Sequence, residues 1–199
     1  EVLVQSITYL SSFQAISALG AIPIACDVNL NSLTLDVKDA RQKITSKTKA
    51  IMPVHYGGSV GEYDKIYELA KRFNLRVIED AAHAFGTINK NQFVGSTGDI
   101  VCFSFDGIKN ITSGEGGCIV SSDKKILERI KDLRLLGVIN DSEARYSGKR
   151  SWEFDVKEQG WRYHMSDLMA AIGIIQLSKI KKFSQKRQKL AKRYKKLTK

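Results

Sequence analysis

Short apolar runs typical of β-strands alternate along this chain with longer runs in which apolar residues recur at helical spacing. A strand, a helix and a second strand in succession form a parallel pair with the helix packed on the sheet, so this alternation limits the fold more than any other feature. We expect strands at residues 2–5, 22–26, 50–54, 76–79, 101–105 and 118–121, and helices at 11–19, 36–44, 62–73 and 124–136. The pattern predicts an α/β fold, a three-layer sandwich around a mostly parallel central sheet.

The last third of the chain departs from this alternation. Residues 138–160 are polar and irregular, and we interpret them as a long loop or a β-excursion that could serve as an active-site flap. Residues 166–199 have a helical pattern without proline, with Ser166 as the expected N-cap, and Gly173 leaves open whether they form one helix or two. We therefore divide the chain into a domain over residues 1–165 and a long basic helix over residues 166–199.

The formal net charge of +11 comes from one terminal segment, because residues 179–199 contain eleven Lys and Arg and no Asp or Glu. Such a run can indicate binding to nucleic acid or to a membrane surface. Phe183, Leu190, Tyr194 and Leu197 nevertheless keep a helical apolar stripe that would face protein, which favours a solvated helix face. A nucleic-acid binder rests on this tail alone, and salt-sensitive DNA binding would support it. We expect neither a nucleic-acid nor a membrane partner.

Three cysteines, Cys26, Cys102 and Cys118, lie in strand-like apolar runs. An odd number of scattered cysteines predicts buried free thiols in a reducing compartment instead of a disulfide framework or a metal site. The three histidines have no metal-like spacing, so no metal is expected. No apolar run has the length of a membrane span or the form of a signal peptide. These features predict a cytoplasmic protein.

Three chemically useful side chains follow the ends of two expected strands. Asp80 comes directly after one, and Ser104 and Lys109 lie at and beyond the end of another. In open α/β sheets, ligands bind at the carboxyl ends of the strands. A lysine amine can form a Schiff base with an aldehyde, and a carboxylate can keep a pyridine nitrogen protonated, which are the two groups that pyridoxal phosphate (PLP) chemistry requires. The spacing alone does not decide the question, because most lysines are simply solvated.

The longer sequence runs around these residues carry more information. The runs at residues 77–84, 94–99 and 103–117 resemble, in order and at the right separations, the sugar aminotransferases of the DegT/DnrJ/EryC1/StrS family, which belong to the aspartate-aminotransferase fold type. The resemblance implies the large domain of a PLP-dependent transferase with PLP as the cofactor. It also implies truncation at both ends, with the family's first helices before Glu1 and a small C-terminal domain after Lys199.

By this resemblance, Lys109 would bind the cofactor covalently and then act as the acid and base of the reaction. Asp80 would bind the pyridine nitrogen. His83 would lie near the ring face or its 3′-oxygen, Ser104 would help to hold the phosphate, and Tyr9 would stack on the ring.

Further positions are less directly matched. Arg162 stands where relatives often have an Asn that reaches the partner subunit's phosphate, and an Arg could contact a phosphate there. His55, in the loop after the third strand, is a candidate for the substrate pocket, whereas Glu79 is expected to point away from the site and to be structural. The glycine-rich run at residues 113–117 lacks the spacing of a phosphate loop, and we interpret it as a tight turn near the lysine.

The resemblance implies transfer of an amino group from an amino acid, glutamate by analogy, to a nucleotide-linked keto-sugar, by a homodimer. Two alternatives remain: a PLP-dependent sugar dehydratase of the same fold, and a non-catalytic regulatory member of the family. Dehydratase relatives replace the lysine with His, so Lys109 argues against the first, and Lys109 together with Asp80 argues against the second.

Overall fold

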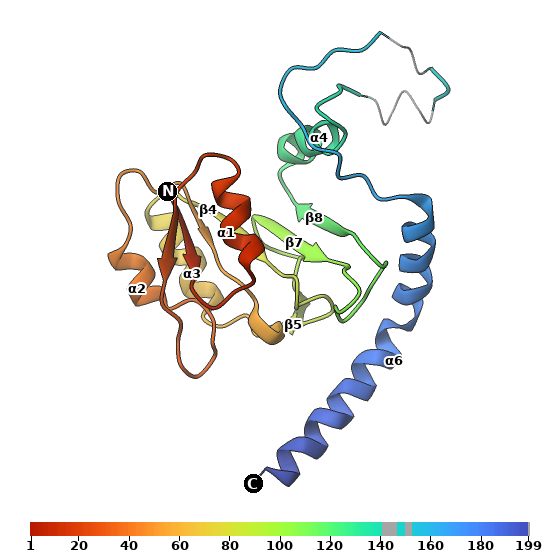
Figure 1. Ribbon diagram of the computed structural model, residues 1–199. Coiled ribbons are helices and arrows are strands. Elements are labelled where there is room, and N and C mark those ends of the chain that lie inside the picture. The colour runs from red at the N-terminus through yellow and green to blue at the C-terminus, as the bar shows by residue number, and fades with distance from the viewer. Residues whose placement is uncertain (141–146, 150–152, 199) are drawn as a thin grey trace.

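The computed structural model describes residues 1–140, 147–149 and 153–198, and its centre is a six-stranded sheet. The strands lie in the order β2 (Pro23–Cys26), β1 (Val2–Gln5), β3 (Ala50–Met52), β4 (Arg76–Asp80), β7 (Ile100–Ser104) and β8 (Gly117–Ser121). The first five strands run parallel, and β8 returns antiparallel to β7 (Figure 1). The predicted α/β fold with a mostly parallel sheet is confirmed.

The helices lie close to their expected positions. They are α1 (Leu10–Ser17), α2 (Val37–Gln42), α3 (Tyr63–Arg72), α4 (Lys124–Leu133) and α6 (Asp167–Leu197). Asp36 caps α2 as predicted, because its carboxylate accepts hydrogen bonds from the backbone N–H groups of Lys38 and Asp39. A 3-10 turn, η1 (Tyr56–Gly58), and a two-stranded hairpin, β5 (Ile88–Asn89) and β6 (Gln92–Phe93), were not expected from the sequence.

The larger apolar core lies between the sheet and the helices α2 and α3. Leu3, Ile51 and Val77 contribute from the strands, and Ala40 and Ile66 contribute from the helices. A smaller cluster around Ala81, Ala84, Val101 and Phe103 continues the core beyond β4, with Phe85 and Phe105 packed against it. The apolar core therefore includes residues of both β4 and β7, the two strands that lead to the expected site.

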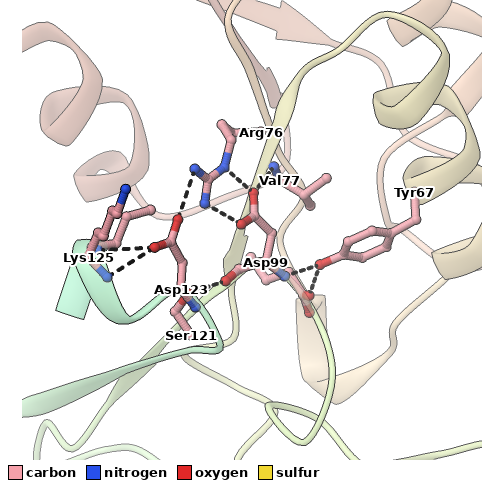
Figure 2. Close-up of polar contacts among 9 residues, drawn as sticks. Tyr67, Arg76, Val77, Asp99, Ser121, Asp123 and Lys125 are labelled. Carbon is pink, nitrogen blue, oxygen red and sulfur yellow. Dashed lines mark hydrogen bonds and ion pairs between the residues drawn. The ribbon is translucent and has the colours of Figure 1, made fainter.

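A polar network fixes β4 and β7 to each other at their amino ends (Figure 2). Arg76 Nε donates to Asp99 Oδ2 at 2.6 Å, the Asp99 N–H donates to the Tyr67 hydroxyl at 2.9 Å, and Ser121 Oγ donates to the Asp99 carbonyl at 2.6 Å. Asp123, the N-cap of α4, adds a second carboxylate at 3.6 Å from Arg76 NH1. Burial opposes the ionisation of Asp99, but the hydrogen bonds from Arg76 outweigh it and hold the pKa of Asp99 below its ordinary value.

Helix α6 is one continuous helix over Asp167–Leu197, so Gly173 does not divide it. Ser166 is its N-cap as predicted, with its hydroxyl accepting from the Met169 N–H at 3.3 Å. Figure 1 shows the helix running past the edge of the sheet, with its basic end extending beyond the body. Among the helices that the structure describes, none has an apolar stretch sufficient to cross a membrane.

The segment interpreted as a flap lies partly outside the described residues. Its described parts contain no strand; a single isolated bridge joins Val138 to Val156.

Candidate active site

Asp80 is held in a fixed orientation at the carboxyl end of β4. Its N–H donates to the Pro53 carbonyl at 2.9 Å, and its carbonyl accepts from the His55 N–H at 3.0 Å, so the backbone is held on both sides. Its Oδ2 accepts from Ser12 Oγ at 2.8 Å, and its Oδ1 accepts from the Ala82 N–H at 3.1 Å. The site thus contains a carboxylate with both oxygens oriented by donors.

Helix α1 brings Ser12 and Tyr9 to this position. Tyr9 is the N-cap of α1, and its carbonyl accepts from the Ser12 N–H at 3.1 Å. The hydroxyl groups of Thr8 and Ser12 lie 2.7 Å apart. The structure therefore places Tyr9 one helical turn from the residue that orients Asp80, and its side chain is 77% exposed. Its stacking role stays a prediction.

Strand β7 carries the chain from the neighbourhood of Asp80 to the lysine. Asp80 pairs in register with Cys102, so the two side chains lie on the same face of the sheet. Burial, assisted by the nearby negative charge of Asp80, raises the pKa of Cys102 to about 12. Ser104 ends the strand, and its hydroxyl accepts from the Asp106 N–H at 3.4 Å. The Lys109 N–H donates to the Asp106 carbonyl at 3.0 Å and closes the next turn.

Lys109 is half-buried at this turn. In the part of the chain that the structure describes, no carboxylate forms an ion pair with its Nζ. A lysine without an ionic partner is free to react with a carbonyl compound once it loses its proton. The two residues central to the sequence prediction therefore lie on adjacent parallel strands, one at the strand end and one in the turn beyond it.

The loop that bears Lys109 is fixed by its own polar groups. Asn110 Nδ2 donates to the Phe85 carbonyl, and Thr112 Oγ1 donates to the Phe105 carbonyl at 3.1 Å. In the glycine-rich run after it, Gly114 and Gly116 have positive φ, and the chain bends at Glu115 before it enters β8. A side chain on Gly117 would place its Cβ 2.5 Å from the Phe103 carbonyl oxygen, so only glycine allows β8 to pair this closely with β7.

His83 lies in the loop after β4 and faces η1. Its Nδ1 accepts from the Gly57 N–H at 3.3 Å, and its ring lies edge-on to the Tyr56 ring with centroids 6.0 Å apart. The ring is exposed on the strand-end side of the molecule. Its predicted contact with the cofactor ring stays a prediction.

His55 is buried in the loop after β3. Its side chain is 1% exposed and its Nε2 lies 2.7 Å from Glu79 Oε2. Its candidate role in the substrate pocket stays a prediction. Glu79 Oε1 also accepts from the hydroxyl groups of Tyr67 and Tyr63. Because Glu79 and Asp80 are successive strand residues, their side chains point to opposite faces. His55 therefore packs in the core beneath the site, and Glu79 is structural, as its position suggested.

Arg162 lies in the segment that runs back along α4. Its backbone forms an isolated antiparallel bridge with Leu135, and its side chain is exposed. No hydrogen bond or ion pair joins it to Asp80 or Lys109 among the described residues. Its role at a phosphate stays a prediction.

A cavity of about 920 Å³ opens beside β7 and β8, between α4 and the start of α6. Its lining includes the following residues: Cys102, Gly116, Cys118, Leu127, Trp161, His164, Met165 and Met169. Cys102 lines this cavity, and its side chain lies on the same face of the sheet as that of Asp80. The Nδ1 atom of His164 is buried in that region without a hydrogen-bond partner among the described residues.

Two residues that shape the site were missed by the sequence interpretation. Ser12 is an ordinary helix residue by pattern, and only its contact with Asp80 shows its role. Gln5 ends β1 with a completely buried amide, whose Oε1 accepts from the N–H groups of Leu35 and Val54, each at 3.0 Å. Its Nε2 donates to the Ile7 carbonyl at 2.7 Å. A polar residue at the end of an apolar strand was the available signal, but it also fits an ordinary turn.

The arrangement is similar to known proteins over its whole length. A model of the DegT/DnrJ/EryC1/StrS aminotransferase family matches residues 1–199. The Methanocaldococcus jannaschii protein MJ1066, which is uncharacterized, is 40% identical over 194 residues, which cover 98% of this chain and 50% of that protein. The spore coat polysaccharide biosynthesis protein SpsC of Bacillus subtilis is 37% identical, with the same two coverages of 98% and 50%. The chain thus spans about half the length of the curated relatives it matches.

Solved structures show the same likeness. Helicobacter pylori PseC, an aminotransferase involved in the biosynthesis of pseudoaminic acid, superposes with a TM-score of 0.90 at 28% identity, covering 100% of this chain and 51% of PseC. The PLP form of Spr1654, a proposed sugar aminotransferase of Streptococcus pneumoniae, superposes with a TM-score of 0.86 at 30% identity, covering 98% and 53%. In both comparisons the chain corresponds to about half of the relative.

Proposed function

This chain belongs to the DegT/DnrJ/EryC1/StrS aminotransferase family, and on that premise we propose that the whole protein is a PLP-dependent aminotransferase. We propose further that it moves an amino group from an amino acid, glutamate, to a nucleotide-linked keto-sugar. The observation that carries the proposal is the pair formed by Asp80 and Lys109. One is a carboxylate oriented by two donors, and the other is an amine in the turn after the adjacent strand, with no ion pair among the described residues.

The chemistry of these residues fits PLP. The cofactor needs a carboxylate for its ring nitrogen, an amine for its aldehyde, and hydrogen-bond donors for its phosphate. Asp80 would hold the ring nitrogen, Lys109 would bind the aldehyde carbon, and the Ser104 hydroxyl would donate to the phosphate. When bound, the cofactor supplies an electron sink for the carbon that exchanges its amino group.

Asp80 would keep a proton on the ring nitrogen. Because its two oxygens already accept from Ser12 and from the Ala82 N–H, its position is set before any ligand arrives. Preorganised electrostatic groups need no rearrangement during reaction, which is the main reason that enzymes use them.

Lys109 would act twice. It would first hold the cofactor, and once displaced by an incoming amine it would move a proton to and from the reacting carbon. Its location in a hydrogen-bonded turn, between Asp106 and Asn110, keeps the start of its side chain in place while the amine moves.

The sugar substrate is supported by the relatives. SpsC is a spore coat polysaccharide biosynthesis protein, and PseC is involved in the biosynthesis of pseudoaminic acid. We take a keto-sugar as the amino acceptor on this basis, and its attachment to a nucleotide follows from the family resemblance.

A homodimer is part of the proposal because large apolar side chains near the site are exposed. Ile108, next to Lys109, is 86% exposed, and Tyr9 is 77% exposed. Exposed apolar groups that adjoin a functional site commonly mark a surface that a partner covers. A second subunit would cover these residues and exclude water from the reacting groups.

The decisive experiment is to treat the full-length protein with PLP and borohydride and to identify the modified peptide by mass spectrometry. We expect the label on Lys109, and we expect Lys109→Ala to take up no label while Lys71→Ala, an exposed helix control, is labelled like the wild type. Glutamate added before borohydride should protect Lys109 from labelling. A label on a different lysine, or none, would contradict the proposal.

A further inference from the structure

Helix α6 lies across the segment that bears Lys109, and its contacts fall on one face. At Gly173 the helix meets Ser113, whose Cβ lies 3.4 Å from the position that a Cβ on Gly173 would take. Two turns further along, Ile180 meets Gly86, with Ile180 Cγ1 lying 3.9 Å from the Cβ position there. Positions seven residues apart lie on the same side of a helix. The first half of α6 therefore packs along the loops around the lysine.

Arg187 lies seven residues beyond Ile180 and makes the next contact on this face. Its NH1 donates to the Asn110 carbonyl at 3.0 Å, a hydrogen bond between residues 77 positions apart in the chain. Its guanidinium carbon lies 5.9 Å from the centroid of the Phe183 ring, one turn back on the helix. Arg187 differs in this from its neighbours: among the described basic residues of 179–198, it alone has a recorded hydrogen bond to another part of the protein.

Asn110 is anchored from two sides as a result. Its side-chain Nδ2 donates to the Phe85 carbonyl on the sheet side, and its backbone carbonyl accepts from Arg187 on the helix side. Phe85 is itself fixed, because its ring contacts the rings of Phe103 and Phe105 edge-on. The other amide atom, Asn110 Oδ1, is buried without a hydrogen-bond partner among the described residues, so Nδ2 alone ties this side chain.

We infer that Arg187 is a positioning residue for Lys109: it holds the Asn110 carbonyl, and through it the turn on which the lysine stands. The inference rests on the proposed function, in which Lys109 is the reactive amine. The peptide unit after Lys109 joins the Lys109 carbonyl to the Asn110 N–H, and the Asn110 carbonyl lies one peptide unit further on. Fixing Asn110 at both its side chain and its carbonyl therefore limits movement of the backbone that adjoins Lys109. A guanidinium suits this task because it keeps its charge at every physiological pH and donates in a fixed geometry.

This contact links the long helix to the reacting residue. Because α6 is continuous from Asp167 to Leu197, a displacement of its outer half would act on the Asn110 carbonyl through Arg187. Among the basic residues of this helix, Arg187 thus has a specific contact with the body of the protein, whereas the others are solvated.

The test compares Arg187→Ala, Arg187→Lys and the control Arg193→Ala in the full-length protein. Arg193 lies on the same helix, has the same charge and is exposed. Hydrogen exchange of the backbone amides of residues 106–112 is measured first, without PLP. We expect exchange to be about fivefold to tenfold faster in Arg187→Ala, the loss expected for one solvent-exposed hydrogen bond, and near the wild-type rate in Arg193→Ala.

The second readout is the bound cofactor. Arg187→Ala should retain PLP about fivefold to tenfold less tightly, and the pH midpoint of its visible absorbance should shift because the amine is less well held. Arg187→Lys, which can still donate to the carbonyl, should recover part of both effects. A variant that was merely less stable would change its unfolding midpoint without this partial rescue.

Equal exchange and equal PLP affinity in Arg187→Ala and Arg193→Ala would overturn the inference, as would an equal loss in both variants. Failure of the wild type to bind PLP would overturn the proposed function, and the exchange measurement alone would then decide whether Arg187 holds the turn.

Discussion

Ser12 Oγ lies 2.8 Å from Asp80 Oδ2, although 68 residues separate them in the chain. The hydroxyl lies on the first helix, and the carboxylate lies at the end of the fourth strand. Their hydrogen bond fixes the position of α1 over the sheet and the rotamer of the carboxylate at once. The orientation of the Asp80 carboxylate therefore depends on Ser12, a residue to which we assign no part in the reaction itself.

Ser12→Ala should weaken the function without unfolding the protein. Removal of one hydrogen bond to a charged group typically costs about 1.5–3 kcal/mol, or roughly tenfold to a hundredfold in rate or affinity. We expect kcat/KM of the full-length enzyme to fall in this range, while Ser11→Ala, an exposed neighbour on the same helix, stays at the wild-type value. Equal values for the two variants would show that the hydroxyl does not orient Asp80.

Asp80→Asn should keep the fold and lose most of the activity. An amide can still accept from Ser12, but it has no charge to hold a proton on a ring nitrogen. A barrier raised by about 4 kcal/mol corresponds to roughly a thousandfold loss in kcat. Circular dichroism should be unchanged. A rate near that of the wild type would mean that another group performs this role.

Gln5→Leu should lower the free energy of unfolding substantially. The substitution leaves the buried N–H groups of Leu35 and Val54 without their acceptor, and each such group costs about 1–3 kcal/mol. We therefore expect a total loss of about 2–6 kcal/mol in urea unfolding. Gln14→Leu, an exposed position on α1, is the control and should change stability little. A loss below about 1 kcal/mol would show that the strand ends find other partners.

The three thiols should resist alkylation in the folded protein. Burial raises the pKa of Cys26 to about 11 and that of Cys102 to about 12, and it also raises the pKa of Cys118. Only the thiolate reacts, so at pH 8 the folded protein should react with iodoacetamide far more slowly than the denatured protein. Mass spectrometry after timed quenching gives the rates. Rapid native alkylation of Cys102 would contradict the raised pKa of its thiol.

Asp99→Asn should destabilise the protein in a pH-dependent way. The pKa of Asp99 is lowered in the folded state, so its ionised form stabilises the fold above its unfolded pKa of about 4, and this contribution is lost as the pH falls through the folded value. The difference in unfolding free energy between the wild type and Asp99→Asn should be present at pH 7 and should shrink below pH ~4. Glu128→Gln, an exposed control, should show no such trend. A difference that is constant with pH would exclude the ion pair with Arg76 as its source.

The parts of this fold that depend on neighbours in sequence were predictable. The apolar runs gave the strands, and Asp36 and Ser166 marked two helix starts because capping depends on the next three residues. The hairpin of β5 and β6 was not predicted, because each of its strands has only two residues, too few to show an alternation of apolar and polar residues. Its turn also depends on positive φ angles at Lys90 and Asn91.

The parts of the site that depend on distant contacts were not predictable. The sequence predicts Asp80 and Lys109 as the reactive pair from local runs alone. The residues proposed to position them make contacts that no local run records: Ser12 lies 68 positions from Asp80, and Arg187 lies 77 positions from Asn110. His55 shows the same limit. It follows a strand end, and no local pattern indicates that its ring turns to Glu79 on the adjacent strand.

The Tyr67 hydroxyl joins the start of β7 to the interior of β4. It accepts from the Asp99 N–H and donates to Glu79, the residue before Asp80 (Figure 2). Burial and the adjacent Glu79 raise the pKa of Tyr67 above its ordinary value, so the phenol keeps its proton further into the alkaline range than an exposed tyrosine. The Tyr67 side chain on α3 thus joins β4 to the residue that precedes β7. The alignment of β4 with the start of β7 is consequently set by side chains that lie outside the site.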